Sequence, residues 1–198
     1  MHLLVAAVAA AAMGTPAPLP VDLSEPTRIS ASADGSTLIL EGPITDGAYS
    51  SFRDVLRAYP IARNVILKSP GGLMFEADRI AQVVRERRMT TAAHTLCASA
   101  CTVILIAGSD RTAAPGAWVG FHRPNVSLSP TPERTLQLTR RLYERAGLAP
   151  SFTARIYATP FESVWYPRVD EMISAGVLTR QIPVTVAFAG GSGFRTGG

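Results

Sequence analysis

Hydrophobic residues with two different spacings alternate along this chain from about residue 36 to residue 188. Short apolar runs between Gly, Pro or polar residues are typical of buried strands, whereas apolar residues three or four apart are typical of a helix face. These patterns predict strands over 36–42, 64–68, 89–94, 111–114, 117–122 and 183–188. They predict helices over 46–59, 73–88, 99–107, 131–146, 151–158 and 169–175.

Repeated alternation of strand and helix predicts an α/β fold with a mainly parallel sheet covered on its faces by helices. The run 99–107 is nearly all apolar, which is typical of a helix buried on every side. The next helix has clear end signals, because Thr131 suits an N-cap, Pro132 suits the first helical position and Gly147 suits the end.

The length and composition fit one domain. At 198 residues, with 47% hydrophobic and 17% charged residues, the chain can bury one sizeable core. We assign 1–17 to a signal peptide or N-terminal anchor, 18–35 to a linker, 36–189 to the folded domain and 190–198 to a disordered Gly-rich tail.

The N-terminal segment resembles an export signal. Residues 1–13 are apolar except for His2, and Pro16, Pro18 and Pro20 follow. The run is shorter than the roughly twenty residues that a membrane span needs, and small residues offer a cleavage point. No Lys or Arg precedes the apolar run, so an uncleaved membrane anchor or a misplaced start codon stay open beside export, which we expect to be to the periplasm.

The charge pattern does not indicate a nucleic-acid partner. The net charge is +4, and the basic residues are Arg apart from Lys68. They close one predicted helix or are spread along another, rather than sharing one face with interleaved aromatic residues, so we expect no nucleic acid to bind.

Three short motifs carry the candidate chemistry: Ser69-Pro70-Gly71-Gly72, Ala98-Ser99-Ala100, and Gly120 to Pro124 around His122. A Gly-Gly pair after a strand frees backbone N–H groups to face an oxyanion. A Ser at a helix start can be a nucleophile, and a His at a strand end can be its base.

Each motif also has a structural interpretation. The glycines can form a plain turn, Ser99 can be a helix N-cap, and His122 can be an exposed strand-end residue. Lys68 and His94 stay open as alternative partners for the serine.

With these motifs in this order, the sequence resembles the ClpP-like branch of the ClpP/crotonase superfamily from about Leu38 to Leu178. The resemblance implies a fold of repeated β-β-α and β-α units. It is closest to exported, largely uncharacterised ClpP-like proteins, which share two cysteines around the serine and a Thr-Pro…Trp segment such as Thr159 to Trp165.

The resemblance implies Ser99 as nucleophile, His122 as general base, and the backbone N–H groups of Gly72 and Ala100 as oxyanion hole. The family's acid position aligns with Val164, which is not a carboxylate. Glu162, two residues before it, is the weak candidate acid, so the site is a Ser-His dyad or an atypical triad.

Cys97 and Cys101 are the only cysteines and lie on either side of Ser99. In an exported chain we expect them to form a disulfide, because residues i and i+4 of a helix lie about 6 Å apart at Cα. Two buried thiols in a helix stay open as the alternative. The spacing makes a poor zinc site, and we expect neither metal nor cofactor.

The leading hypothesis is therefore an exported serine hydrolase that works as an ATP-independent endopeptidase on polypeptides. Such a protein would have no ATP-driven unfoldase partner, and the resemblance allows a homo-oligomer. The alternative is a catalytically weak or inactive ClpP-like module that binds peptides or acts as a scaffold. A crotonase-like enzyme acting on acyl-CoA is a third hypothesis, but no carboxylate matches it and an exported enzyme would lack coenzyme A.

Overall fold

The computed structural model describes residues 21–126 and 131–182. Within these residues six strands form one sheet, in the order β1-β2-β3-β4-β5, with β6 also paired to β4. The predicted leader, the strand predicted over 183–188 and the Gly-rich tail lie outside the described residues.

The sheet begins with a strand that the sequence analysis missed. β1 (Arg28–Ala31) lies in the stretch expected to be a linker, and it pairs antiparallel with β2 (Thr37–Glu41). Its four residues carry too short a pattern to indicate a strand, and it owes its order to hydrogen bonding along β2. Just before it, the Thr27 hydroxyl donates to the Pro43 carbonyl oxygen at 2.7 Å.

The central strands are parallel. β3 (Asn64–Ser69) lies between β2 and β4 (Thr90–Ala98). β5 (Arg111–Ala113) pairs with the first half of β4 and β6 (Trp118–Gly120) pairs with its last three residues. β4 therefore continues four residues past the predicted end at His94, because β6 supplies a partner that no local pattern indicates.

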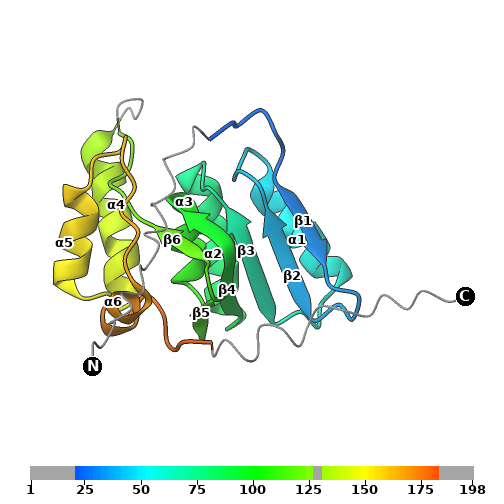
Figure 1. Ribbon diagram of the computed structural model, residues 1–198. Coiled ribbons are helices and arrows are strands. Elements are labelled where there is room, and N and C mark those ends of the chain that lie inside the picture. Colours follow the sequence, from blue (N-terminus) through cyan, green and yellow to red (C-terminus); the bar gives the residue numbers. More distant parts are fainter. Residues whose placement is uncertain (1–20, 127–130, 183–198) are drawn as a thin grey trace, which may run out of the picture.

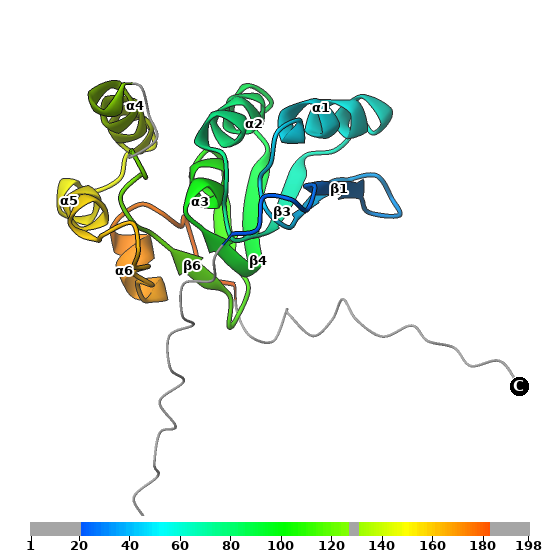
Figure 2. The same cartoon turned by 90° about the horizontal axis from the view of Figure 1, so that it is seen from above.

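Helices cover one face of the sheet. α1 (Ala48–Ala58), α2 (Met74–Glu86) and α3 (Ala100–Leu105) lie on the same side (Figure 2). Along β3 the side chains of Val65, Leu67 and Ser69 are buried beneath them, while the alternate positions are only half-buried. All six side chains of α3 are buried, as its apolar sequence predicts.

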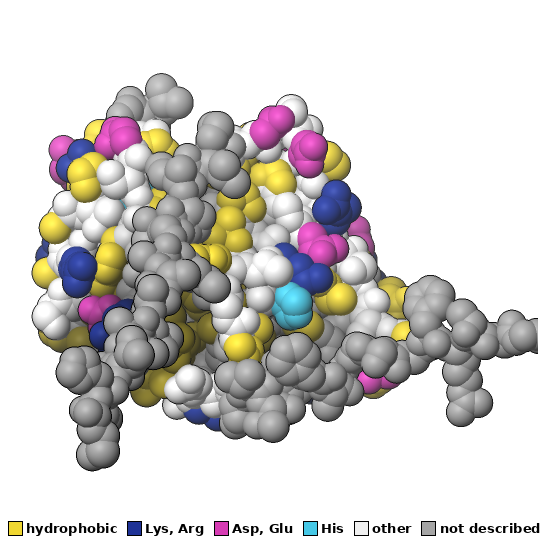
Figure 3. All heavy atoms as spheres, in the orientation of Figure 1, with side chains coloured by type: hydrophobic (Ala, Val, Ile, Leu, Met, Phe, Trp, Pro, Cys, Tyr) yellow, Lys and Arg dark blue, Asp and Glu magenta, His cyan; other side chains and the backbone are white. Residues whose placement is uncertain are grey.

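The expectation that helices cover both faces is wrong for the described part of the chain. The second face carries the ion pair between Lys68 Nζ and Glu41 Oε1, at 3.0 Å. The space-filling view from this side shows acidic, basic and histidine side chains beside hydrophobic ones (Figure 3). Strands β2 and β3 alternate buried and half-buried positions, the pattern of a sheet packed on one side.

Three further helices group together beside the sheet on the β6 side (Figure 1). They are α4 (Pro132–Arg145), α5 (Pro150–Ala158) and α6 (Val169–Ser174). The Arg111 side chain on β5 joins the end of α6 to the sheet by donating to the carbonyl oxygens of Gly176 and Val177, at 2.8 and 3.0 Å. None of the helices in the described ranges is long and apolar enough to span a membrane.

Candidate active site

Ser99, His122 and Glu162 line one cavity of about 640 Å³. The cavity opens beside the carboxyl ends of β3, β4 and β6, where parallel strands deliver the loops that follow them. Its walls are mostly apolar, with contributions from Leu73, Met74, Leu96, Pro124, Val164 and Tyr166. The sequence motifs therefore meet at one site, although they are separated along the chain.

Ser99 forms a sharp turn between β4 and α3. Its backbone has φ +54° and ψ −125°, and apart from Ser99 only Arg88 among the described non-glycine residues has a positive φ. The turn is held on both sides, since the Ser99 N–H donates to Gly120 O at 3.0 Å and the Thr102 hydroxyl donates to Ser99 O at 2.7 Å. A strained backbone fixed in this way places Ser99 in the lining of the cavity.

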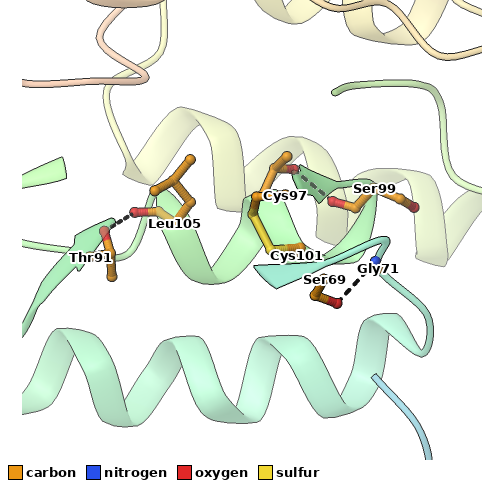
Figure 4. Close-up of a disulfide and its surroundings, with 8 residues drawn as sticks. Ser69, Gly71, Thr91, Cys97, Ser99, Cys101 and Leu105 are labelled. Atoms are coloured by element: carbon orange, nitrogen blue, oxygen red, sulfur yellow. Dashed lines mark hydrogen bonds between the residues drawn. A yellow bond between two sulfur atoms is a disulfide. The ribbon is translucent and has the colours of Figure 1, made fainter. Parts of the chain in front are cut away.

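A disulfide joins the two residues that flank this turn. Cys97 and Cys101 are bonded, with their Cα atoms 5.3 Å apart (Figure 4). Cys97 is the penultimate residue of β4 and Cys101 is the second residue of α3, so the bond closes the chain around Ser99. Both cysteines are fully buried.

Two backbone N–H groups near Ser99 have no hydrogen-bond partner among the described residues. They belong to Gly72, which lines the cavity, and to Ala100, the first residue of α3. The first N–H groups of a helix have no acceptor within the helix, and they lie at the positive end of its dipole. Neither N–H group therefore has an acceptor among the described residues, and that of Gly72 borders the cavity.

Each of the two glycines of the loop has a different neighbour that leaves no room for a side chain. A Cβ on Gly71 would lie 2.6 Å from the Ala98 carbonyl oxygen and 2.8 Å from the Ser99 Cβ. A Cβ on Gly72 would lie 2.2 Å from the carbonyl oxygen of Ile44. Their φ angles of +100° and +143° also favour glycine.

The loop is supported from both sides. The Ser69 hydroxyl accepts the Gly71 N–H at 3.1 Å. Ile44 donates its N–H to Gly71 O and accepts the Leu73 N–H, both at 2.8 Å. Four residues beyond Gly72, the buried Glu76 carboxylate accepts the Tyr49 N–H at 2.7 Å and so joins α2 to the start of α1. The sequence patterns did not indicate that Ile44 and Glu76 support the site. Ile44 acts through its backbone and Glu76 accepts an N–H from another helix, and neither kind of contact has a local sequence pattern.

His122 follows β6 and is 8% exposed. Burial lowers the pKa of its imidazole, and the Arg123 backbone and the charge of Glu162 oppose this only in part. The ring is therefore neutral at neutral pH, as a general base must be. Its Nδ1 is buried and has no hydrogen-bond partner among residues 21–126 and 131–182.

No carboxylate of the described residues hydrogen-bonds to His122. Glu162 is exposed and acts on the imidazole only through its charge. Asp170, the next carboxylate along the chain after Glu162, is bound to the Arg168 guanidinium at 2.6 Å. Val164, at the position aligned with the family's acid, faces Gly120, where a Cβ would come within 2.5 Å of the valine Cγ1.

The alternative partners for Ser99 lie elsewhere. Lys68 is paired with Glu41, and His94 is exposed on β4; neither lines the cavity. Among the described residues no group of three or more His, Cys, Asp or Glu side chains is arranged to hold a metal ion.

Comparison with solved structures identifies the fold. ClpP1 from Listeria monocytogenes superimposes with a TM-score of 0.63 and 18% identity, covering 75% of this chain and 92% of that one. A point mutant of the same protein gives a TM-score of 0.62 with the same identity and coverage. The chain therefore has a ClpP-like fold. No protein-family model and no curated protein sequence matches it.

Proposed function

We propose that this chain is a serine hydrolase that cleaves polypeptides, with Ser99 as nucleophile and His122 as general base. Backbone N–H groups of Gly72 and Ala100 would bind the oxyanion. The observation that carries this proposal is the pair of N–H groups without partners beside the strained Ser99 turn. An oxyanion hole needs such donors, held in place before the reaction begins.

The proposed reaction follows from these groups. Ser99 Oγ attacks the peptide carbonyl carbon while His122 takes the hydroxyl proton, and the carbonyl oxygen becomes an anion facing the two N–H groups. The C–N bond then breaks and His122 returns the proton to the leaving amine. Water then attacks the acyl carbon while His122 takes its proton, and as the bond from that carbon to Ser99 Oγ breaks, His122 returns the proton to Oγ and releases the acid product.

The proposed base works without a hydrogen-bonded acid. Removing the acid from a triad enzyme lowers turnover by orders of magnitude, so we expect slow turnover. Glu162 would contribute through its charge, which favours the imidazolium formed during the reaction.

We also propose that the protein is exported. The buried disulfide supports this, because disulfides persist in oxidising compartments and are rare in the cytosol. Outside the cytoplasm no ATP-driven unfoldase would deliver substrates, so these would be unfolded chains, short peptides or exposed loops. Assembly as a homo-oligomer is part of the same proposal, by analogy with the fold.

The test is covalent labelling with a fluorophosphonate, which reacts with activated serines. We expect the wild-type protein to be labelled and Ser99→Ala to lose all labelling with an unchanged circular dichroism spectrum. Ser51→Ala, at an exposed position on α1, is the matched control and should be labelled at the wild-type rate.

A second candidate function is a peptide-binding module without turnover. The unpartnered Nδ1 of His122 favours it, because an imidazole without an acceptor is a weak base. A folded wild-type protein that resists the probe but binds an unfolded peptide in a fluorescence anisotropy titration would establish this candidate instead.

A further inference from the structure

A strap of seven residues, Thr159 to Trp165, is bonded to both chain neighbours of His122. On one side Phe121 and Trp165 exchange two backbone hydrogen bonds, each of 2.8 Å. On the other side the Arg123 N–H donates to Thr159 O at 3.0 Å. The strap therefore begins and ends at fixed points on either side of the histidine.

The middle of the strap places an aromatic ring against the imidazole. The Ser163 N–H donates to Pro160 O at 3.1 Å, which closes a tight turn around Phe161. The Phe161 ring centroid lies 5.0 Å from that of His122, with the ring planes tilted by 45°. Phe161 also lines the cavity and is 40% exposed, whereas the His122 side that it contacts belongs to a residue only 8% exposed.

The anchor at Trp165 is itself rigid. The Trp165 ring packs against Phe152 of α5 with centroids 4.6 Å apart, and the Arg155 guanidinium lies over the Trp165 ring, 4.2 Å from its centroid. The position of Phe161 is thus fixed by helix packing as well as by backbone hydrogen bonds.

We propose that Phe161 is a positioning residue for His122, and that its aromatic contact replaces the carboxylate hydrogen bond that orients the histidine of a Ser-His-Asp triad. This inference rests on the proposed function. Two observations carry it: the buried Nδ1 has no acceptor, and a strap fixed on both sides of the histidine brings an aromatic ring against it.

The contact would act in two ways. A tilted aromatic pair at this separation has a favourable energy, which restricts the orientations of the imidazole. The ring also keeps water from the imidazole, which favours its neutral form. Glu162 is the one charged group among the cavity-lining residues that faces His122. The other elements packed around the site contribute uncharged side chains: Ser99, Leu73, Met74, Thr135, Val21 and Leu23.

Three variants separate these two effects. Phe161→Ala removes both the ring and the cover, Phe161→Leu keeps an apolar cover without the ring, and Phe161→Trp keeps both. Phe75→Ala is the matched control, because Phe75 is a more exposed aromatic residue at 68% and lies outside the cavity lining. Two quantities are measured: the pKa of His122 by NMR, assigned with His122→Gln, and the pH dependence of fluorophosphonate labelling at saturating probe.

For Phe161→Ala we expect a higher His122 pKa, an acid limb of the labelling profile shifted to higher pH by the same amount, and a maximal rate lower by about three- to tenfold. For Phe161→Leu we expect the slower rate without the pKa shift, and for Phe161→Trp a rate close to wild type. Phe75→Ala should leave both quantities unchanged.

An unchanged His122 pKa and an unchanged rate in Phe161→Ala would overturn the inference. If Phe161→Ala does not fold, a wild-type rate in Phe161→Leu overturns it instead. A wild-type protein that is not labelled at all refutes the proposed function, and the NMR titration then still decides whether Phe161 covers His122.

Discussion

Ser99 holds a backbone conformation that few residues other than glycine adopt. The surrounding residues compensate for this strain, because the Gly120 carbonyl, the Thr102 hydroxyl and the disulfide all act on the same turn. A serine that served only as a helix cap would need no such support. At the scale of single residues, the strain is therefore the feature that best distinguishes a nucleophile from a cap.

Gly72 and Gly116 allow a prediction about the oxyanion loop. Both have a positive φ, but a Cβ on Gly72 would collide with Ile44 O, whereas a Cβ on Gly116 would meet nothing within 4 Å. We expect Gly116→Ala to lower the free energy of unfolding by about 1 kcal/mol, through backbone strain alone. Gly72→Ala should lower the free energy of unfolding by more than Gly116→Ala does, and it should also abolish fluorophosphonate labelling.

Urea unfolding and labelling, measured on both variants, check this prediction. Gly116 also has a positive φ, at +79° against +143° for Gly72, so the additional loss in Gly72→Ala reflects the clash with Ile44 together with the less accessible backbone of Gly72. Normal labelling of Gly72→Ala would contradict the assignment of its N–H to the oxyanion hole.

The sequence indicated which motifs would form the candidate site, but not which residues surround them. Ser99, His122 and Gly72 carry recognisable motifs, and all three line one cavity. The contact between Phe161 and His122 had no signal in the sequence, because the ring reaches His122 only through a strap whose two anchors are backbone hydrogen bonds. Glu162 was the candidate acid because it lies two residues before Val164 in the sequence. That separation does not determine the direction in which a turn places a side chain.

Whole helices and strands were predicted well where the pattern is local. The predicted bounds of α1, α2, α4 and α5 lie within two residues of the observed ones. The two differences, β1 and the end of β4, both involve strands stabilised by a distant partner. A pattern read along one segment contains no information about such pairing.

The disulfide gives a prediction at the junction of β4 and α3. A loop of five residues closed by a disulfide is expected to stabilise the fold by about 2 kcal/mol. We expect the double variant Cys97→Ala/Cys101→Ala to have a free energy of unfolding lower by about 2 kcal/mol. We also expect slower fluorophosphonate labelling, because the Ser99 turn loses one of its restraints.

Urea unfolding with and without dithiothreitol provides the control for that experiment. The reductant should lower the stability of the wild-type protein and leave the double variant unchanged. Equal labelling rates in the wild-type protein and the double variant would show that the bond stabilises the fold without supporting the turn.

At the scale of the whole molecule, one buried face of the sheet carries the core, and the site lies at the edge where the strands end. His122 couples this site to global stability. Burial lowers its pKa below the ordinary value of 6.5, so the unfolded chain binds a proton at a pH where the folded chain does not. The contribution of the neutral His122 to stability is therefore fully present above pH 6.5, and it is lost as the pH falls toward the pKa of His122 in the folded chain.

We therefore expect the free energy of unfolding to decrease between pH 7.5 and 5.5, and to decrease less in His122→Asn. His94→Asn, at an exposed position, should behave like the wild type. Urea unfolding of the wild type and both variants at three pH values measures how the free energy of unfolding depends on pH. Equal slopes for His122→Asn and the wild type would refute the coupling.

The hydrogen bond from the Ser99 N–H to Gly120 O has a mechanical consequence. His122 follows Gly120 by two residues, so a displacement of β6 would move Ser99 and His122, the proposed nucleophile and base, in the same direction. The Gly71–Gly72 loop is held by a different set of backbone hydrogen bonds, those to Ile44. Any motion that switches this site on or off would therefore shift the Gly72 N–H relative to Ser99, His122 and the Ala100 N–H, rather than separate the serine from the histidine.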